Sequence, residues 1–125
     1  VCSSDLQLKL DADWVILSAC NTAAVSGRGA EAASGLARAF LYAGSRAVVV
    51  SHWPVETRSA RDLMTSLFEH YSQDPKISRA GALQSAMVST IKNGKFATPG
   101  TNRPLFSYAH PTFWAPFALI GDGGR

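Results

Sequence analysis

The sequence predicts an α/β domain built on a mostly parallel sheet. Two short apolar runs, residues 14–19 and 46–51, are typical of buried strands, and the second is rich in β-branched valine. Residues 30–43 lie between them and repeat apolar side chains at helical spacing, until Gly44 supplies a stop. A crossover of helical length joins parallel strands, so this stretch is predicted to form a right-handed βαβ unit.

Three further elements are expected after this unit. Apolar side chains recur at helical spacing over residues 57–71, and again over residues 78–93, so both segments are predicted helices. Residues 94–112 are rich in Gly, Pro, Asn and Thr and are predicted to form a loop. A final apolar strand is expected over 113–121, with Pro116 at an edge position or an entry bend.

The chain is expected to hold one domain, residues 14–122, between a poorly defined segment, 1–13, and a frayed tail, 123–125. Its 125 residues, with 46% apolar side chains, are enough for one hydrophobic core. Three strands are few for an open α/β sheet, which typically has about five or six. The small sheet and the lack of an initiator Met predict a fragment whose N-terminal strands are missing.

Composition excludes several classes of function. The net charge is +3, but the twelve Lys and Arg residues are scattered, so direct nucleic-acid binding is not expected. No apolar run reaches the roughly 18 residues of a membrane span, and the first residues do not have the pattern of a secretory signal, so neither feature is expected. Two cysteines do not make a disulfide framework, which favours a reducing, cytoplasmic setting.

Cys20 is the candidate nucleophile. It follows the first predicted strand and is preceded by the small residues Ser18 and Ala19. The carboxyl end of a buried strand is where an α/β fold exposes a reactive group, although a lone cysteine is also often an inert core residue. A cysteine nucleophile needs a base, and no histidine precedes Cys20.

Several segments, in this order, closely resemble the C-terminal half of CHAT domains, the caspase-like domains of the clan that also holds separases. The segments that carry the resemblance are 17–22 (LSACNT), 27–29 (GRG), 35–44 (GLARAFLYAG), 48–55 (VVVSHWPV) and 110–122 (HPTFWAPFALIGD). The resemblance implies a caspase-like three-layer α/β/α fold and a Cys–His dyad endopeptidase. It also implies association with tetratricopeptide repeats, in cis or as a partner.

Cys20 matches the catalytic cysteine of the family, and its backbone N–H is the natural oxyanion donor. The family's catalytic histidine lies upstream, and in caspases it is roughly 50 residues before the cysteine. Only 19 residues precede Cys20 here, and none is His. We therefore expect the base to lie outside these 125 residues and the chain alone to be inactive.

Glu56 and Asn21 are the candidate substrate-binding residues. Asn21 directly follows Cys20, and Glu56 follows the second predicted strand. Loops beside the nucleophile line specificity pockets in this clan, so an acidic Glu56 would favour a basic side chain before the scissile bond. The equally weighted alternative is that Glu56 is a helix N-terminal acid, stabilised by the dipole of the helix that begins at Thr57.

The three histidines and the loop glycines Gly27 and Gly29 receive no catalytic role. His52 and His110 are interpreted as structural and His70 as solvated, and no compact ligand spacing supports zinc. A nucleotide-binding interpretation rests only on Gly27 and Gly29, without a P-loop lysine or the third glycine of a dinucleotide motif. No cofactor or metal is expected.

Three functions remain in order of support. The first is a fragment of a bacterial-type, caspase-like cysteine endopeptidase that cleaves a protein or peptide substrate by acyl transfer to Cys20. The second is a non-catalytic scaffold or protein-interaction module with the same fold. The third is the nucleotide-binding domain, which a null titration with nucleotide would dismiss.

Overall fold

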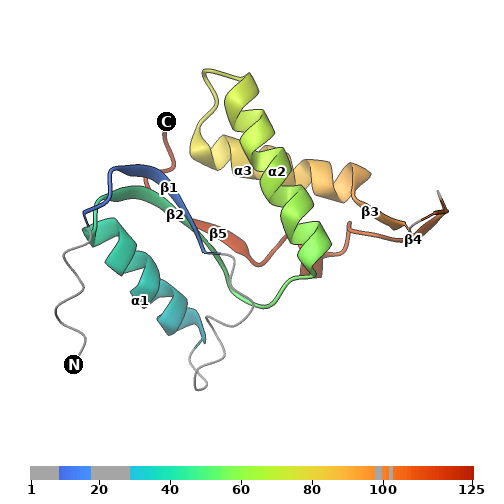
Figure 1. Ribbon diagram of the computed structural model, residues 1–125, viewed down its shortest axis with the longest axis horizontal. Coiled ribbons are helices and arrows are strands. Elements are labelled where there is room, and N and C mark those ends of the chain that lie inside the picture. The colour runs from blue at the N-terminus through green and yellow to red at the C-terminus, as the bar shows by residue number, and fades with distance from the viewer. Residues whose placement is uncertain (1–8, 18–28, 98–99, 102) are drawn as a thin grey trace. The chain divides into compact units, whose positions relative to one another are not determined.

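The computed structural model describes residues 9–17, 29–97, 100–101 and 103–125. Its contacts divide the chain into two compact units, which are considered separately (Figure 1). The first unit comprises Val1–Pro54 and Phe117–Asp122, and the second comprises Val55–Pro116 and Gly123–Arg125.

The first unit is a three-stranded sheet with one helix. Its elements are β1 (Ala12–Leu17), α1 (Gly29–Tyr42), β2 (Ser45–Ser51) and β5 (Phe117–Gly121), and the strand order is β1-β2-β5. The pair β1–β2 is parallel and the pair β2–β5 is antiparallel. The predicted βαβ unit is therefore confirmed. The described sheet is mixed, and a mostly parallel sheet with a three-layer fold is not confirmed.

The core of this unit lies between α1 and one face of the sheet. Val48 and Val50 on β2 are buried with Ala37 on α1, and partly buried side chains surround them. The alternate residues Ala47 and Val49 are also buried, so both faces of β2 are covered, as the continuous apolar run predicted.

Gly44 ends α1 as the sequence predicted. Its φ angle is +110°, which glycine adopts without steric cost, and a Cβ there would clash with the carbonyl oxygen of Leu10. The N–H of Leu10 donates to the carbonyl of Ala43, the residue before Gly44, at 2.6 Å. Glycine thus lets the chain turn from the helix into β2 while the segment before β1 passes close by.

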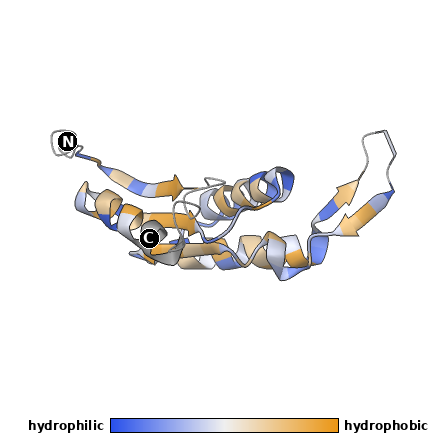
Figure 2. Cartoon of the chain, turned by 90° about the horizontal axis from the view of Figure 1, so that it is seen from below, coloured by the Kyte–Doolittle hydropathy of each residue, from blue (hydrophilic) through white to orange (hydrophobic). Residues whose placement is uncertain are grey.

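The second unit pairs two helices and carries a hairpin. Its elements are α2 (Thr57–Gln73), α3 (Arg79–Asn93), β3 (Lys95–Ala97), β4 (Pro104–Ser107) and the 3₁₀ turn η1 (Pro111–Phe113). The two helices bury apolar side chains against each other, and these are Leu63, Leu67, Ala82, Leu83 and Ala86. The hairpin β3–β4 projects beyond the end of α3 (Figure 2).

The prediction of a loop over 94–112 was wrong, because the segment contains the antiparallel pair β3–β4 and the turn η1. Phe96 pairs with Phe106 across the hairpin, which brings two aromatic rings together. The last strand begins at Phe117 rather than at 113, directly after the buried Pro116. Pro116 therefore lies at the entry to this strand, which is one of the two positions that the sequence predicted for it.

The prediction of a frayed tail was also wrong. The backbone N–H groups of Arg79 and Ala80, in the first turn of α3, donate to the carbonyls of Gly124 and Gly123 at 2.8 and 3.1 Å. The guanidinium of Arg125 donates to the carbonyl of Asp74 at 3.0 Å and lies over the Tyr71 ring. The tail therefore satisfies N–H groups that a helix start leaves without an intrahelical partner.

Candidate functional site

The carboxyl ends of β1 and β2 define one edge of the sheet. The two strands are parallel, with Leu17 opposite Val50, so they end side by side. The chain leaves β1 at Leu17, three residues before Cys20. In open α/β folds ligands bind outside the carboxyl ends of parallel strands, which makes this edge the candidate site.

Two of the three predicted site residues, Cys20 and Asn21, lie outside the described residues. Their proximity to Glu56 therefore stays a prediction. The other side of the edge is described: β2 ends at the buried Ser51, and the exposed His52 and Trp53 follow it. The chain then leaves the sheet at Pro54.

Glu56 is the N-cap of α2. Its Oε1 accepts the backbone N–H of Arg58 at 3.0 Å and its Oε2 accepts that of Ser59 at 2.8 Å. The hydroxyl of Ser59 in turn donates a hydrogen bond to the backbone carbonyl of Glu56 at 2.9 Å. These contacts satisfy two N–H groups at the start of α2, and they place the negative charge at the positive end of the helix dipole. The helix-terminal role proposed for Glu56 is therefore present in the structure.

Tyr108 is a third partner of the Glu56 carboxylate and was not expected from the sequence. Its hydroxyl donates to Glu56 Oε2 at 3.0 Å, and the residue is fully buried. Burial of the phenol, the hydrogen bond to Glu56 and its negative charge raise the pKa of Tyr108 to about 12. Partial burial raises the pKa of Glu56, but the hydrogen bonds from Ser59, Arg58 and Tyr108 outweigh it and leave that pKa below 4.5.

The hairpin is fixed to α2 by a column of stacked side chains. The Arg58 guanidinium lies 5.4 Å from the centre of the Phe96 ring, and its Nη1 donates to the carbonyl of Ala97 at 3.4 Å. Phe96 stacks on Phe106 at 4.9 Å, and Phe106 stacks on Phe113 at 5.9 Å. The alternation in Lys-Phe-Ala and Leu-Phe-Ser on either side of a Gly- and Asn-containing stretch is the sequence signal that could have revealed this hairpin.

Replacing Glu56 with glutamine tests the cap. Because the folded-state pKa is depressed, the stabilisation by the carboxylate is fully present above the unfolded-state pKa near 4.5 and is lost as the pH falls through the folded-state value. We expect Glu56→Gln to cost about 1 kcal/mol at neutral pH, measured by urea unfolding. The difference from the wild-type chain should shrink as the pH falls below 4.5 and through the lower folded-state pKa of Glu56.

Glu69→Gln, at an exposed position on the same helix, is the matched control and should change the unfolding free energy by less than about 0.5 kcal/mol. A Glu56→Gln difference that stays constant between neutral and acid pH would contradict the role of the ionised cap.

The remaining histidines have local roles. His110 is the N-cap of η1, where its Nδ1 accepts the backbone N–H of Thr112 at 3.2 Å, in line with a structural role. His70 is half-buried rather than fully solvated, and it borders an open groove of about 350 Å³ between α2 and α3. Among the residues that the structure describes, no three His, Cys, Asp or Glu side chains are grouped to hold a metal ion.

The parallel βαβ unit, the antiparallel strand β5 and the helices α2 and α3 define a mixed α/β protein, and its sequence has a cysteine three residues after β1. The chain belongs to the CHAT domain family, whose family model matches residues 3–122. It is also 31% identical over 120 residues to tetratricopeptide repeat protein 28 of Mus musculus.

That alignment covers 94% of this chain and 4% of the mouse protein, so the chain spans a small part of the curated relative. No solved structure matches the chain. Within the described residues, no helix is both long enough and apolar enough to cross a membrane.

Proposed function

We propose that this chain supplies the nucleophile of a caspase-like cysteine endopeptidase, with Cys20 as the attacking thiol. The observation that carries the proposal is the parallel β1–β2 pair: the two strands end side by side, and β1 ends three residues before Cys20. Membership of the CHAT family supports it, together with the resemblance of the segment around Cys20 to the motif that carries the family's catalytic cysteine.

The proposed reaction is acyl transfer. The Cys20 thiolate attacks the scissile carbonyl, and a thioester forms as the amine leaves with a proton from the imidazolium of the base. Water, deprotonated by the same imidazole, then hydrolyses the thioester and restores the thiol. The backbone N–H of Cys20 stabilises the oxyanion. The resemblance places the base upstream of the nucleophile, and we assign it to none of His52, His70 and His110.

Glu56 is proposed to select a basic residue before the scissile bond. Its carboxylate accepts three hydrogen bonds within the second unit, from Arg58, Ser59 and Tyr108. An ionised carboxylate has about four acceptor positions, so one remains for a substrate guanidinium or ammonium group. The Glu56→Gln variant gives a second measurement here: a lost preference for Arg or Lys substrates supports the role, and an unchanged preference contradicts it.

Thiol alkylation tests the class of enzyme. We expect the natural full-length protein to cleave an unfolded protein substrate, and iodoacetamide to abolish the cleavage. The chain holds two cysteines, so Cys2→Ser is the control. This variant should cleave at the wild-type rate and remain sensitive to alkylation. Cleavage that survives complete alkylation of Cys20 would exclude Cys20 as the nucleophile.

A non-catalytic interaction module is the second proposal. The favouring observation is the similarity to a tetratricopeptide repeat protein, together with the structural engagement of Glu56 in the cap of α2. Repeat proteins present extended binding surfaces, so a domain beside them is well placed to serve as a docking platform. Absence of cleavage by the full-length protein before any alkylation, with intact folding, would favour this proposal over the peptidase.

A further inference from the structure

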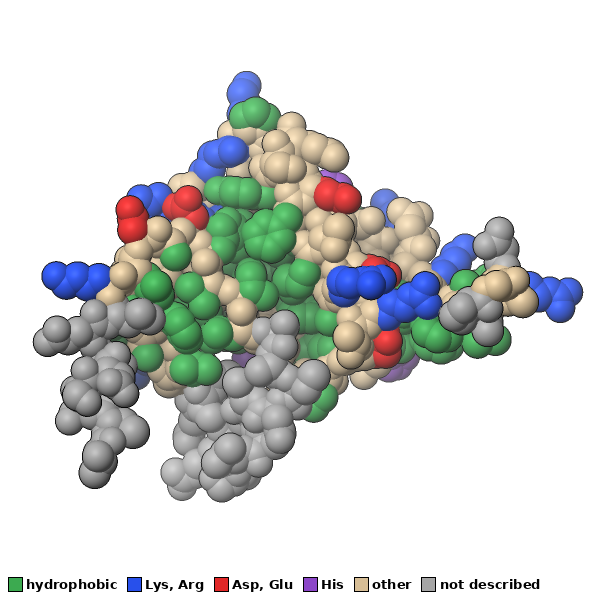
Figure 3. Space-filling view, in the orientation of Figure 1, with side chains coloured by type: hydrophobic (Ala, Val, Ile, Leu, Met, Phe, Trp, Pro, Cys, Tyr) green, Lys and Arg blue, Asp and Glu red, His purple; other side chains and the backbone are tan. Residues whose placement is uncertain are grey.

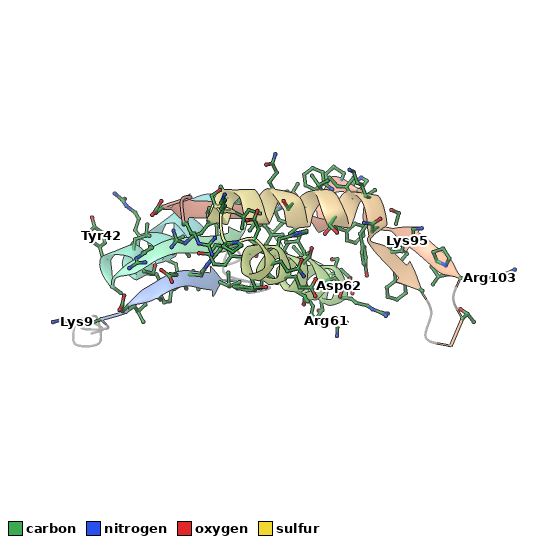
Figure 4. All side chains as sticks on the ribbon, turned by 90° about the horizontal axis from the view of Figure 1, so that it is seen from above. Lys9, Tyr42, Arg61, Asp62, Lys95 and Arg103 are labelled. Carbon is green, nitrogen blue, oxygen red and sulfur yellow. The ribbon has the colours of Figure 1, made fainter. Side chains whose placement is uncertain are left out.

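The hairpin β3–β4 presents an exposed surface that combines apolar and basic side chains. Leu105 is 64% exposed and Phe106 43% exposed, and all four residues of β4 are exposed. Lys95 and Arg103 belong to the same hairpin (Figure 4). We call the surface formed by Lys95, Arg103, Leu105 and Phe106 the hairpin surface. Figure 3 shows hydrophobic and basic side chains side by side at this end of the second unit.

The hairpin surface is held in place by the body of its unit. An isolated two-stranded hairpin is marginally stable in water. Here the column of Arg58, Phe96, Phe106 and Phe113 anchors it, and the Tyr108 N–H donates to the carbonyl of Gly94 at 2.9 Å. The exposed apolar side chains are therefore preorganised, which lowers the entropy cost of binding a partner.

The outer edge of β4 is open to a further strand. Among the described residues β4 pairs only with β3, whereas β3 is also contacted by the Arg58 guanidinium, at the carbonyl of Ala97. Alternation along β4 places Leu105 on the same face as Ser107, and Ser107 pairs with Lys95. A strand added beside β4 would thus meet Leu105 and the Lys95 ammonium on one face.

The positive charge of this part of the chain favours an acidic partner. The sequence contains no Asp or Glu between Asp74 and Asp122, while Lys76, Arg79, Lys92, Lys95 and Arg103 all fall within this stretch. Like charges disfavour a second copy of the same hairpin, since Lys95 and Arg103 would face their equivalents. An acidic segment gains both charge complementarity and burial of Leu105.

The aromatic rings argue for a protein partner rather than a nucleic acid. Phe106 stacks on both Phe96 and Phe113, with interplanar angles of 4° and 18°. Its ring is therefore already stacked within the column and is not a free platform for the bases of a single-stranded nucleic acid.

We propose that the hairpin surface binds an extended, acidic and aliphatic segment of a protein partner, which adds as a strand to the outer edge of β4. The surface does not involve Cys20, so this proposal stands or falls independently of the peptidase activity.

The probe is a peptide in which glutamate and valine alternate. Its binding to the full chain is measured by fluorescence anisotropy. Cys20 is replaced by alanine in this chain, so that the peptide is not cleaved. We expect saturable binding that weakens with added salt, and slower hydrogen exchange at the amides of Leu105 to Ser107. The double variant Lys95→Glu with Arg103→Glu should weaken binding about tenfold, since two attractions become repulsions at exposed positions.

The matched control is Lys76→Glu, an exposed charge reversal in the loop between α2 and α3. It should change the affinity less than about twofold. The proposal is overturned if the peptide does not bind, or if Lys76→Glu weakens binding as much as the double variant. It is also overturned if the peptide slows hydrogen exchange only at amides outside β4. Tighter binding of a single-stranded oligonucleotide or of phosphatidylserine vesicles would also overturn it, as would charge-independent dimerisation through the hairpin.

Discussion

Replacing Cys20 with alanine is expected to lower kcat/KM for peptide cleavage in the full-length protein by at least about a thousandfold. Alanine has no group that can form the thioester, so the covalent route is lost. Contributions to catalysis that do not depend on the thiol would remain, and they would leave only weak residual activity. KM should therefore change much less than kcat.

Two variants control for this result. Cys2→Ala removes the other thiol and should leave kcat/KM within about twofold of wild type. His52→Ala removes the exposed histidine that follows β2, and it should retain most of the activity, because the resemblance assigns the base to another position. Wild-type activity of Cys20→Ala would exclude Cys20 as the nucleophile. A loss at His52→Ala equal to that at Cys20→Ala would assign the base to His52.

Replacing Tyr108 with alanine is expected to cost about 3–5 kcal/mol of unfolding free energy, the largest stability effect that we predict. The residue is fully buried, and its ring lies 4.9 Å from that of Phe113 and 5.8 Å from that of Phe106. Truncation leaves a cavity at the base of the hairpin and removes the hydroxyl donor of Glu56. Tyr42→Ala, at a residue that is 87% exposed, should cost less than about 0.5 kcal/mol.

Tyr108→Phe separates the hydrogen bond from the packing. It should cost about 1–2 kcal/mol at neutral pH, because the ring remains while a charge-assisted bond is lost. The folded-state pKa of about 12 lies above the ordinary value of 10.0, so the stabilisation by the protonated phenol is complete below pH 10 and is lost as the pH rises to 12.

The wild-type and Tyr108→Phe stabilities should therefore converge over this interval in urea unfolding experiments. A difference that persists unchanged at pH 12 would show that the phenol does not donate to Glu56.

The strands and the first helix could be predicted because their signals are local. Residues 46–51 form a continuous apolar run, and Gly44 marks the turn before it. The antiparallel direction of β5 was not predictable in the same way, because strand direction depends on partners that are distant in the sequence. Phe117 pairs with Ser51, and nothing in the composition of either segment specifies that register.

The hairpin and the tail were missed for two different reasons. Residues 94–112 contain Gly, Pro and Asn, and these residues are as typical of the turn in a hairpin as of an irregular loop. The contacts of the tail could not be predicted from side chains, because they are made by the backbone. The carbonyls of Gly123 and Gly124 accept N–H groups at the start of α3.

For Glu56, the helix-cap role was foreseen and the hydrogen bond from Tyr108 was not. An acid directly before a predicted helix indicates a cap, so the bonds from Arg58 and Ser59 follow from local sequence. Tyr108 is 52 positions further along the chain, and only the folded second unit brings its hydroxyl to the carboxylate.

The most direct test of the central claim is to identify the atom that the substrate acylates. The full-length protein would be mixed with a peptide ester ending in arginine, quenched in acid within one turnover and digested for mass spectrometry. We predict a thioester, with the mass of the peptide acyl group, on the fragment that contains Cys20, and none in the Cys20→Ala variant. An acyl group on Cys2 or on a serine, or turnover with no adduct on Cys20, would contradict the account.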